Sequence, residues 1–272
     1  MTPDALKTLE FQIQAYMTRI ADQAADPAPF KLKQAHTERV RGHIQRLSEA
    51  LGLDSRSGVR AEAAALIHDL GRFPQYMRFN TFSDPLSTNH AALSAGVVCR
   101  EKLLRFVARY DRQLILRAVA LHNRRSLPQG LSPDLDCLAR LLRDADKMDI
   151  FGVMVSLYKN GSGVRSFITH NLPDDGQIRK ELVDRMMTGN GIPYSDVATL
   201  NDLKLSQLSM IYDLNFPGAA AHALAQGVVQ KILRSMPQDL SDLEFCLLRY
   251  LEQMAGKQTG LSGPGQPCAG IA

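Results

Sequence analysis

Apolar residues recur along this chain with the three- to four-residue spacing of amphipathic helices. One stripe begins after His36 and comprises Val40, Ile44, Leu47 and Leu51. Gly52 ends this stripe, and Gly71 ends a second one over residues 59–70, as glycine does at many helix C-termini. No segment shows the sustained two-residue alternation of a half-buried β-strand. The pattern therefore predicts an all-α protein.

The same spacing predicts the remaining helices and the division of the chain. We expect helices over residues 4–22, 36–51, 59–70, 88–110, 111–122, 134–158, 176–188, 200–213, 217–236 and 238–255. Residues 71–87 include two prolines and several polar side chains, so a long loop is expected there. We expect a helical domain over residues 1–158 and a helical C-terminal extension over 159–255 that packs on the same core. Residues 256–272 are small and rich in helix breakers, which predicts a disordered tail.

Composition narrows the class of protein. The 272 residues are 45% apolar and 22% charged, which is ordinary for a globular protein and excludes a disordered or fibrous chain. The net charge of only +4 does not predict nucleic acid as a partner. The chain has no run of eighteen apolar residues, so no membrane span is expected. The N-terminus lacks the basic start and apolar core of a signal peptide. We therefore expect a cytoplasmic protein without a membrane partner.

Several histidines and aspartates lie on faces that should be buried. His36, His90, His122 and Asp146 continue apolar stripes at helical spacing, and the pair His68-Asp69 ends a nearly all-apolar helix. Burying such groups costs several kcal/mol each unless they are paired or bind a metal. The simplest common explanation is a shared cation. Neutral imidazole and carboxylate suit Mn, Fe, Zn, Co or Ni. None of the four cysteines forms a CxxC pair, which excludes a zinc ribbon.

Three segments of the chain carry a family resemblance. HTERV at 36–40, ALIHDLGRF at 65–73 and RDADKMDIFG at 143–152 resemble, in this order, the motifs of the HD superfamily of metal-dependent phosphohydrolases. The resemblance covers about residues 30–155 and implies an HD-domain helical bundle. It implies that His36, His68, Asp69 and Asp146 hold one divalent cation. By spacing alone His43 is a rival for His36, since both lie on one helix face about 10 Å apart, and the resemblance favours His36.

The resemblance also bears on a second cation. HD enzymes with two metals carry additional histidines between the His-Asp pair and the last aspartate, where His90 and His122 lie here, and Asp69 would then bridge the two ions. The chain departs from the HD-GYP branch, because Asn123 replaces a second adjacent histidine, Arg72 replaces a lysine, and a GYP segment is absent. It looks like an unassigned HDIG-type hydrolase with one or two divalent ions, for which Mn, Fe, Ni, Co, Zn and Mg all remain open.

The resemblance implies roles for the residues around these ligands. The activity would be hydrolysis of a phosphomonoester or phosphodiester, with a nucleotide-like substrate, by a metal-activated water that Asp69 or Asp146 orients. Arg72 and Lys147 are expected to act in catalysis by holding phosphate oxygens, and Asn123 and Arg124 to help bind the substrate. Residues 75–87 are a candidate substrate lid, or equally a loop that its own aromatic side chains anchor. The chain has no P-loop and no serine-hydrolase motif.

Two other function classes remain open at this point. A metal-bearing HD fold could bind a nucleotide as a sensor without turnover, and intact ligands favour the enzyme over this alternative. A nuclease is disfavoured by the weak net charge and the lack of a basic stripe. The expected partner is a small phosphorylated substrate; the sequence predicts neither its identity, nor the native metal, nor the oligomeric state.

Overall fold

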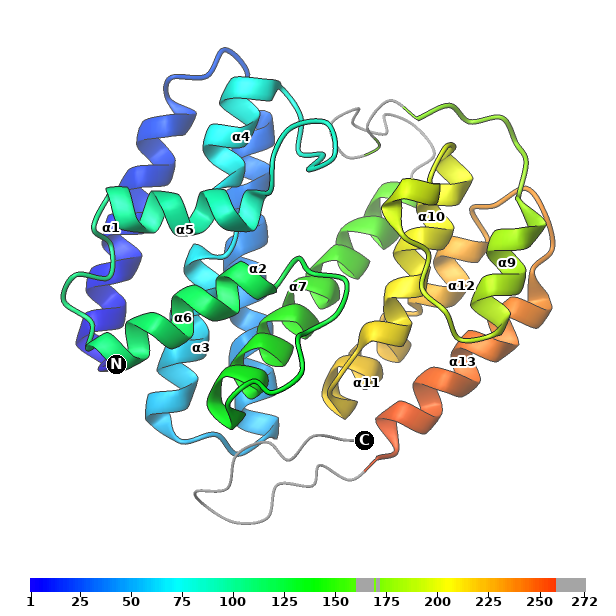
Figure 1. The fold of residues 1–272 in the computed structure, drawn as a ribbon. Helices are drawn as coiled ribbons and strands as arrows, with labels where there is room; N and C mark the ends of the chain where they lie inside the picture. Colours follow the sequence, from blue (N-terminus) through cyan, green and yellow to red (C-terminus); the bar gives the residue numbers. More distant parts are fainter. Residues whose placement is uncertain (160–168, 170–171, 258–272) are drawn as a thin grey trace. The chain divides into compact units, whose positions relative to one another are not determined.

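The computed structural model describes residues 1–159, 169 and 172–257, and none of these residues forms a β-strand (Figure 1). The prediction of an all-α protein is confirmed. The described chain divides into two compact units, one formed by Met1–Asp146 and one that begins at Lys147. The division falls inside the longest helix, α7, which spans Pro133–Lys159. No helix in the described part of the chain has both the length and the apolar character needed to cross a membrane.

The first unit is a bundle of helices around α3. Its helices are α1 (Pro3–Ala21), α2 (Ala28–Ala50), α3 (Ser55–Ile67), α4 (Arg72–Phe79), α5 (His90–Arg100), α6 (Arg109–Leu121) and the first half of α7. Helix α3 packs against α1, α2 and α6, and α5 packs against α4 and α6. Helix α3 is fully buried at four alanines that lie on different sides of the helix, Ala61, Ala63, Ala64 and Ala65. Such small side chains let three neighbouring helices approach α3 closely, so its C-terminus lies among them.

Helix α4 lies where a loop was predicted. Pro74 falls in its first turn, where the backbone amide has no intrahelical partner, so this proline removes no helical hydrogen bond. Asn80 ends the helix in the left-handed conformation, with φ of 51°. Gly71 precedes the helix, and a Cβ atom at this position would lie 2.2 Å from the carbonyl oxygen of His90. The glycine therefore permits the close approach of α4 to the start of α5.

Two predicted helices are shorter than expected. The helix expected over 88–110 ends at Arg100, and Lys102 follows with φ of 54°, so the chain turns before α6 begins. The helix expected over 217–236 divides into α11 (Pro217–Ala225) and α12 (Val228–Leu233). Gly227 separates them with φ of 59°, a conformation that glycine adopts without the strain of a side chain.

The second unit is also helical. It contains the rest of α7, α9 (Lys180–Met187), the 3₁₀ helices η1 (Tyr194–Asp196) and η2 (Met210–Asp213), α10 (Leu200–Ser209), α11, α12 and α13 (Ser241–Ala255). Helix α13 packs against α9, α11 and α12. That these helices pack on the core of the first unit stays a prediction. The predicted tail lies outside the described residues from 258 on.

Candidate metal centre

The ends of several helices bring the predicted ligands together within the first unit. His36 comes from α2, His68 ends α3 and Asp69 follows it, His90 begins α5, and His122 ends α6. Asp146 lies in α7. All four histidines and Asp69 are buried, and His68 is completely inaccessible to solvent. The helix register read from the sequence therefore converges on one cluster.

One group of donor atoms joins α2, α3 and α7. The Nε2 atom of His36 lies 3.2 Å from Nε2 of His68 and 3.2 Å from Oδ1 of Asp146. The Nε2 atom of His68 lies 3.9 Å from the same Asp146 oxygen. These three residues offer ligand atoms within 4.8 Å of one another, which is the spacing at which one cation can contact all three.

A second group shares His68 and adds Asp69 and His122, again within 4.8 Å of one another. Asp69 also lies between two further imidazoles, because its Oδ2 lies 3.4 Å from Nε2 of His36 and its Oδ1 lies 3.4 Å from Nε2 of His90. A carboxylate placed in this way can offer one oxygen to each of two neighbouring ions.

The ring orientations test whether these residues fit a metal. The Nδ1 atoms of His68 and His122 each lie 2.7 Å from a backbone carbonyl, those of Ala65 and Val119. A carbonyl only accepts, so Nδ1 donates and Nε2 is left with a lone pair. His90 donates from Nδ1 in the same way, to a carboxylate oxygen of Asp84 at 2.7 Å.

The lone pairs created in this way face one another. The Nε2 atoms of His90 and His122 lie 3.0 Å apart, although neither neutral ring has a proton left to donate there. Two facing lone pairs repel unless a cation lies between or beside them. The donor set thus fits a metal better than it fits a hydrogen-bonded core.

The electrostatics give four of the clustered groups, the two histidines His90 and His122 and the two aspartates, the protonation form that binds metal. Burial lowers the pKa of His90 and of His122 to about 4, so both rings are neutral at pH 7. Burial alone would raise the pKa of Asp69, but the surrounding positive charges, led by that of Lys33, together outweigh it and hold this pKa well below the usual range. Burial would also raise the pKa of Asp146, but its hydrogen bond to His36 and the charge interactions with His36 and His68 together outweigh burial and lower this pKa. The neutral imidazoles of His90 and His122 thus lie in one cluster with two carboxylates that stay ionised.

Two of the predicted substrate-binding residues lie beside the cluster. Arg72 has its Nε 3.4 Å from Oδ1 of Asp69, and its Nη1 donates to the Phe82 carbonyl and to Asp84. Asn123 donates from Nδ2 to Oδ2 of Asp84 at 3.1 Å. Both side chains therefore reach the cluster through Asp84, and their roles toward a substrate stay predictions.

The other two predicted substrate-binding residues have different surroundings. Lys147 begins the second unit, where its ammonium lies 2.7 Å from Oδ2 of Asp213 and is nearly buried. A phosphate contact would require Lys147 to exchange this partner. Arg124 has an exposed side chain, and its carbonyl accepts a hydrogen bond from Arg143. His43, the rival of His36, contacts Arg46 through Nδ1 at 2.9 Å and belongs to neither ligand group in the described chain.

Two residues at the cluster were not predicted from the sequence. Lys33 places its Nζ 2.7 Å from Oδ2 of Asp69 and 5.4 Å from the centre of the Phe82 ring. Lys33 precedes His36 by one helical turn, so the register of α2 could have indicated it. Asp84 lies in the segment between α4 and α5, where no periodicity marks it.

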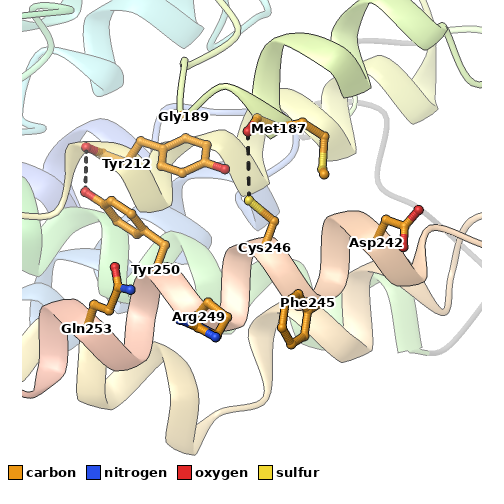
Figure 2. Close-up of a pocket in the computed structure, with 9 residues that line it drawn as sticks. All are labelled: Met187, Gly189, Tyr212, Asp242, Phe245, Cys246, Arg249, Tyr250 and Gln253. Atoms are coloured by element: carbon orange, nitrogen blue, oxygen red, sulfur yellow. Dashed lines mark hydrogen bonds between the residues drawn. The ribbon is translucent and has the colours of Figure 1, made fainter.

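A pocket of about 630 Å³ lies within the second unit (Figure 2). Its walls come from the end of α9, from η2 and from one face of α13, and the rings of Tyr212 and Tyr250 meet edge to face at 4.9 Å. The Tyr250 hydroxyl donates to the Tyr212 carbonyl at 3.4 Å. The described lining has a single carboxylate, Asp242, and lacks histidine, so this pocket has different chemistry from the ligand cluster.

Comparison with protein families identifies one match. The family model described as HD domain matches residues 34–150, a range that includes all six predicted ligands. Comparisons with curated proteins and with solved structures gave no match.

Proposed function

Residues 34–150 match the HD-domain family, and on that premise we propose that this chain is a metal-dependent phosphohydrolase that cleaves a small, nucleotide-like phosphomonoester or phosphodiester. The observation that carries the proposal is the pair of facing Nε2 atoms of His90 and His122, 3.0 Å apart, beside two ionised carboxylates. A structural core would gain nothing from this arrangement, whereas a site for divalent cations requires it.

Six side chains form two proposed sets of ligands, and one carboxylate is shared by both sets. His36, His68 and Asp146 would hold one cation, and His90 and His122 a second, with Asp69 between them. When bound, the cations would polarise the phosphate and lower the pKa of the attacking water. With neutral histidines, the six ligands together carry only the two negative charges of the carboxylates. A pair of divalent ions would therefore keep a net positive charge, which attracts a phosphate.

Cationic side chains next to Asp69 are suited to the phosphate oxygens. The Nε atom of Arg72 is buried without a hydrogen-bond partner, and its distance to Oδ1 of Asp69 is 3.4 Å. We propose that this N–H donates to the phosphate when substrate is bound. Lys33 approaches the same carboxylate from α2 and adds positive charge at the cluster. Arg124, with its exposed guanidinium, would contact more distant groups of the substrate.

A screen of phosphorylated metabolites with Mn²⁺, Ni²⁺, Co²⁺ and Mg²⁺ added separately tests the proposal. Release of phosphate or of a nucleoside monophosphate is expected with at least one pair of metal and substrate. The variant His36→Gln should lose this activity, and His43→Gln is its matched control, because His43 is also buried and lies on the same helix but outside both ligand groups. If the chain binds metal and nucleotide but turns over no substrate, the proposed enzymatic activity is contradicted and a role as a sensor is favoured.

A further inference from the structure

We propose that Asp84 positions His90, so that its Nε2 faces the candidate metal centre. This inference rests on the proposed function, because it assigns Asp84 a role toward the cations that His90 would bind. Asp84 follows α4 in the segment that leads to α5, and Oδ2 and Oδ1 lie 2.7 and 2.9 Å from Nδ1 of His90.

The need for Asp84 follows from where each histidine sits on its helix. His68 and His122 end their helices, and each finds a backbone carbonyl three residues earlier, on Ala65 and Val119. His90 is instead the first residue of α5, so no preceding helical turn offers it a carbonyl. The acceptor for its Nδ1–H must come from elsewhere in the fold, and Asp84 supplies it.

The carboxylate of Asp84 is itself held in place from several directions. Arg72 donates from Nη1 to Oδ1 at 3.0 Å, and the fully buried Gln75 donates from Nε2 to the same oxygen at 2.9 Å. Asn123 donates to Oδ2 at 3.1 Å from the turn after α6. Three donors from two parts of the first unit therefore fix one carboxylate, which gives His90 a rigid partner.

This arrangement has a chemical consequence for the ligand. A carboxylate that accepts from Nδ1–H fixes the ring tautomer and makes Nε2 a more basic ligand than a carbonyl partner would. Loss of such a partner typically weakens metal binding 10- to 100-fold. Because His90 belongs to only one of the two proposed ligand sets, the weakening should fall on one cation and leave the other unchanged.

Titration of the metal-free chain with Co²⁺, followed by calorimetry and by visible absorption, tests this role. Asp84→Asn should weaken one of two Co²⁺ sites about 10- to 100-fold. In a His90→Gln background the same substitution should cause no further loss, because the two residues act as one unit. Ring ¹⁵N shifts should show His90 protonated at Nδ1 in the wild type and a mixture of tautomers in Asp84→Asn, a readout that a merely structural residue would not move.

Ser87→Ala is the matched control. Ser87 lies in the same segment, accepts from Gln75 and donates to the Ser83 carbonyl, but does not touch His90 in the described contacts. It should bind Co²⁺ like the wild type, which separates loss of Asp84 from general loosening of the loop. Equal Co²⁺ affinity in Asp84→Asn and wild type, or equal losses with and without His90, would overturn the inference. A wild type that binds Co²⁺ but hydrolyses nothing would instead contradict only the proposed function.

Discussion

His90 and His122 face each other with their Nε2 atoms 3.0 Å apart, and each ring already uses Nδ1 as a donor, to Asp84 and to the Val119 carbonyl. The two rings come from opposite ends of their helices, since His90 begins α5 and His122 ends α6. Neither ring can donate to the other while both are neutral. The pair is therefore arranged to bind a positive charge in common.

This pair predicts two cations per chain. With a divalent metal in excess, elemental analysis should find two ions per chain, and a structure should place them about 3.5–4 Å apart, as in other two-metal sites. His122→Gln should leave one ion, held by His36, His68 and Asp146. A wild type with a single ion, and with both imidazoles more than about 3 Å from it against the roughly 2.0–2.1 Å of a ligand bond, would defeat the two-metal arrangement.

Asp69 makes a separate prediction, because it lies between the two proposed ligand sets. Asp69→Ala should lose both cations, whereas His36→Ala should lose one. The physical reason is that removal of a shared ligand leaves each ion with an open position and unpaired neighbours. Metal content after gel filtration measures the difference. Equal metal content in Asp69→Ala and wild type would rule out Asp69 as a ligand.

Arg72→Ala should reduce turnover about ten- to a hundredfold, the equivalent of a lost charge-assisted contact of about 1.5–3 kcal/mol. Metal content should be unchanged, because His90 keeps its hydrogen bond to Asp84 in this variant. Steady-state kinetics together with metal analysis make the distinction. Arg78→Ala, on the same helix and beside Phe79, is the control. If Arg72→Ala has wild-type kinetics, the role of Arg72 is limited to its contacts with Phe82 and Asp84, which hold the loop.

The metal-free chain should become less stable as the pH falls from about 6.5 to about 4. Burial lowers the pKa of His90 and His122 from 6.5 to about 4 in the folded chain. Between these values the unfolded chain binds more protons than the folded one, so the free energy of unfolding rises with pH across this window. His122→Gln should flatten the dependence measured by urea unfolding. An unchanged slope in this variant would show that His122 titrates normally when folded.

The sequence was sufficient to predict which histidines and aspartates cluster, but not the contacts that orient them. His36, His68, His90, His122 and Asp146 could be predicted because helical periodicity shows which face of a helix is buried. Asp84 could not, because its contact with His90 depends on the path of an irregular segment. Helix α4, just before this segment, was not predicted either, because a proline in a first helical turn has the same sequence signature as a proline in a loop.

Lys147 shows a second limit of prediction from sequence, which concerns ion pairs between residues far apart in the chain. Lys147 was expected at a phosphate because it follows Asp146 in the chain. The structure pairs it with Asp213, 66 residues further on. Adjacent helical residues point about 100° apart, so neighbours in sequence need not share a site. Pairing over such separations is decided by packing, which no local pattern in the sequence encodes.

Gly71→Ala should destabilise the first unit and weaken metal binding together. A Cβ atom at this position would lie 2.2 Å from the carbonyl oxygen of His90, 2.5 Å from the amide nitrogen of Ser94 and 2.7 Å from Cβ of Leu93. Backbone atoms cannot swing away as a side chain can, so α5 would have to shift, and His90 with it. We expect a loss of about 3 kcal/mol in unfolding free energy, the upper end of the usual cost of overpacking.

Gly96→Ala is the control for this last variant, because it makes the same change within α5 and its Cβ would meet nothing within 4 Å. Alanine should stabilise the helix there by about 0.5–1 kcal/mol and leave Co²⁺ affinity unchanged. Urea unfolding and Co²⁺ titration of the two variants separate crowding at the metal centre from the general preference of helices for alanine. A Gly71→Ala chain as stable as Gly96→Ala, with wild-type Co²⁺ affinity, would show that the start of α5 can move without disturbing His90.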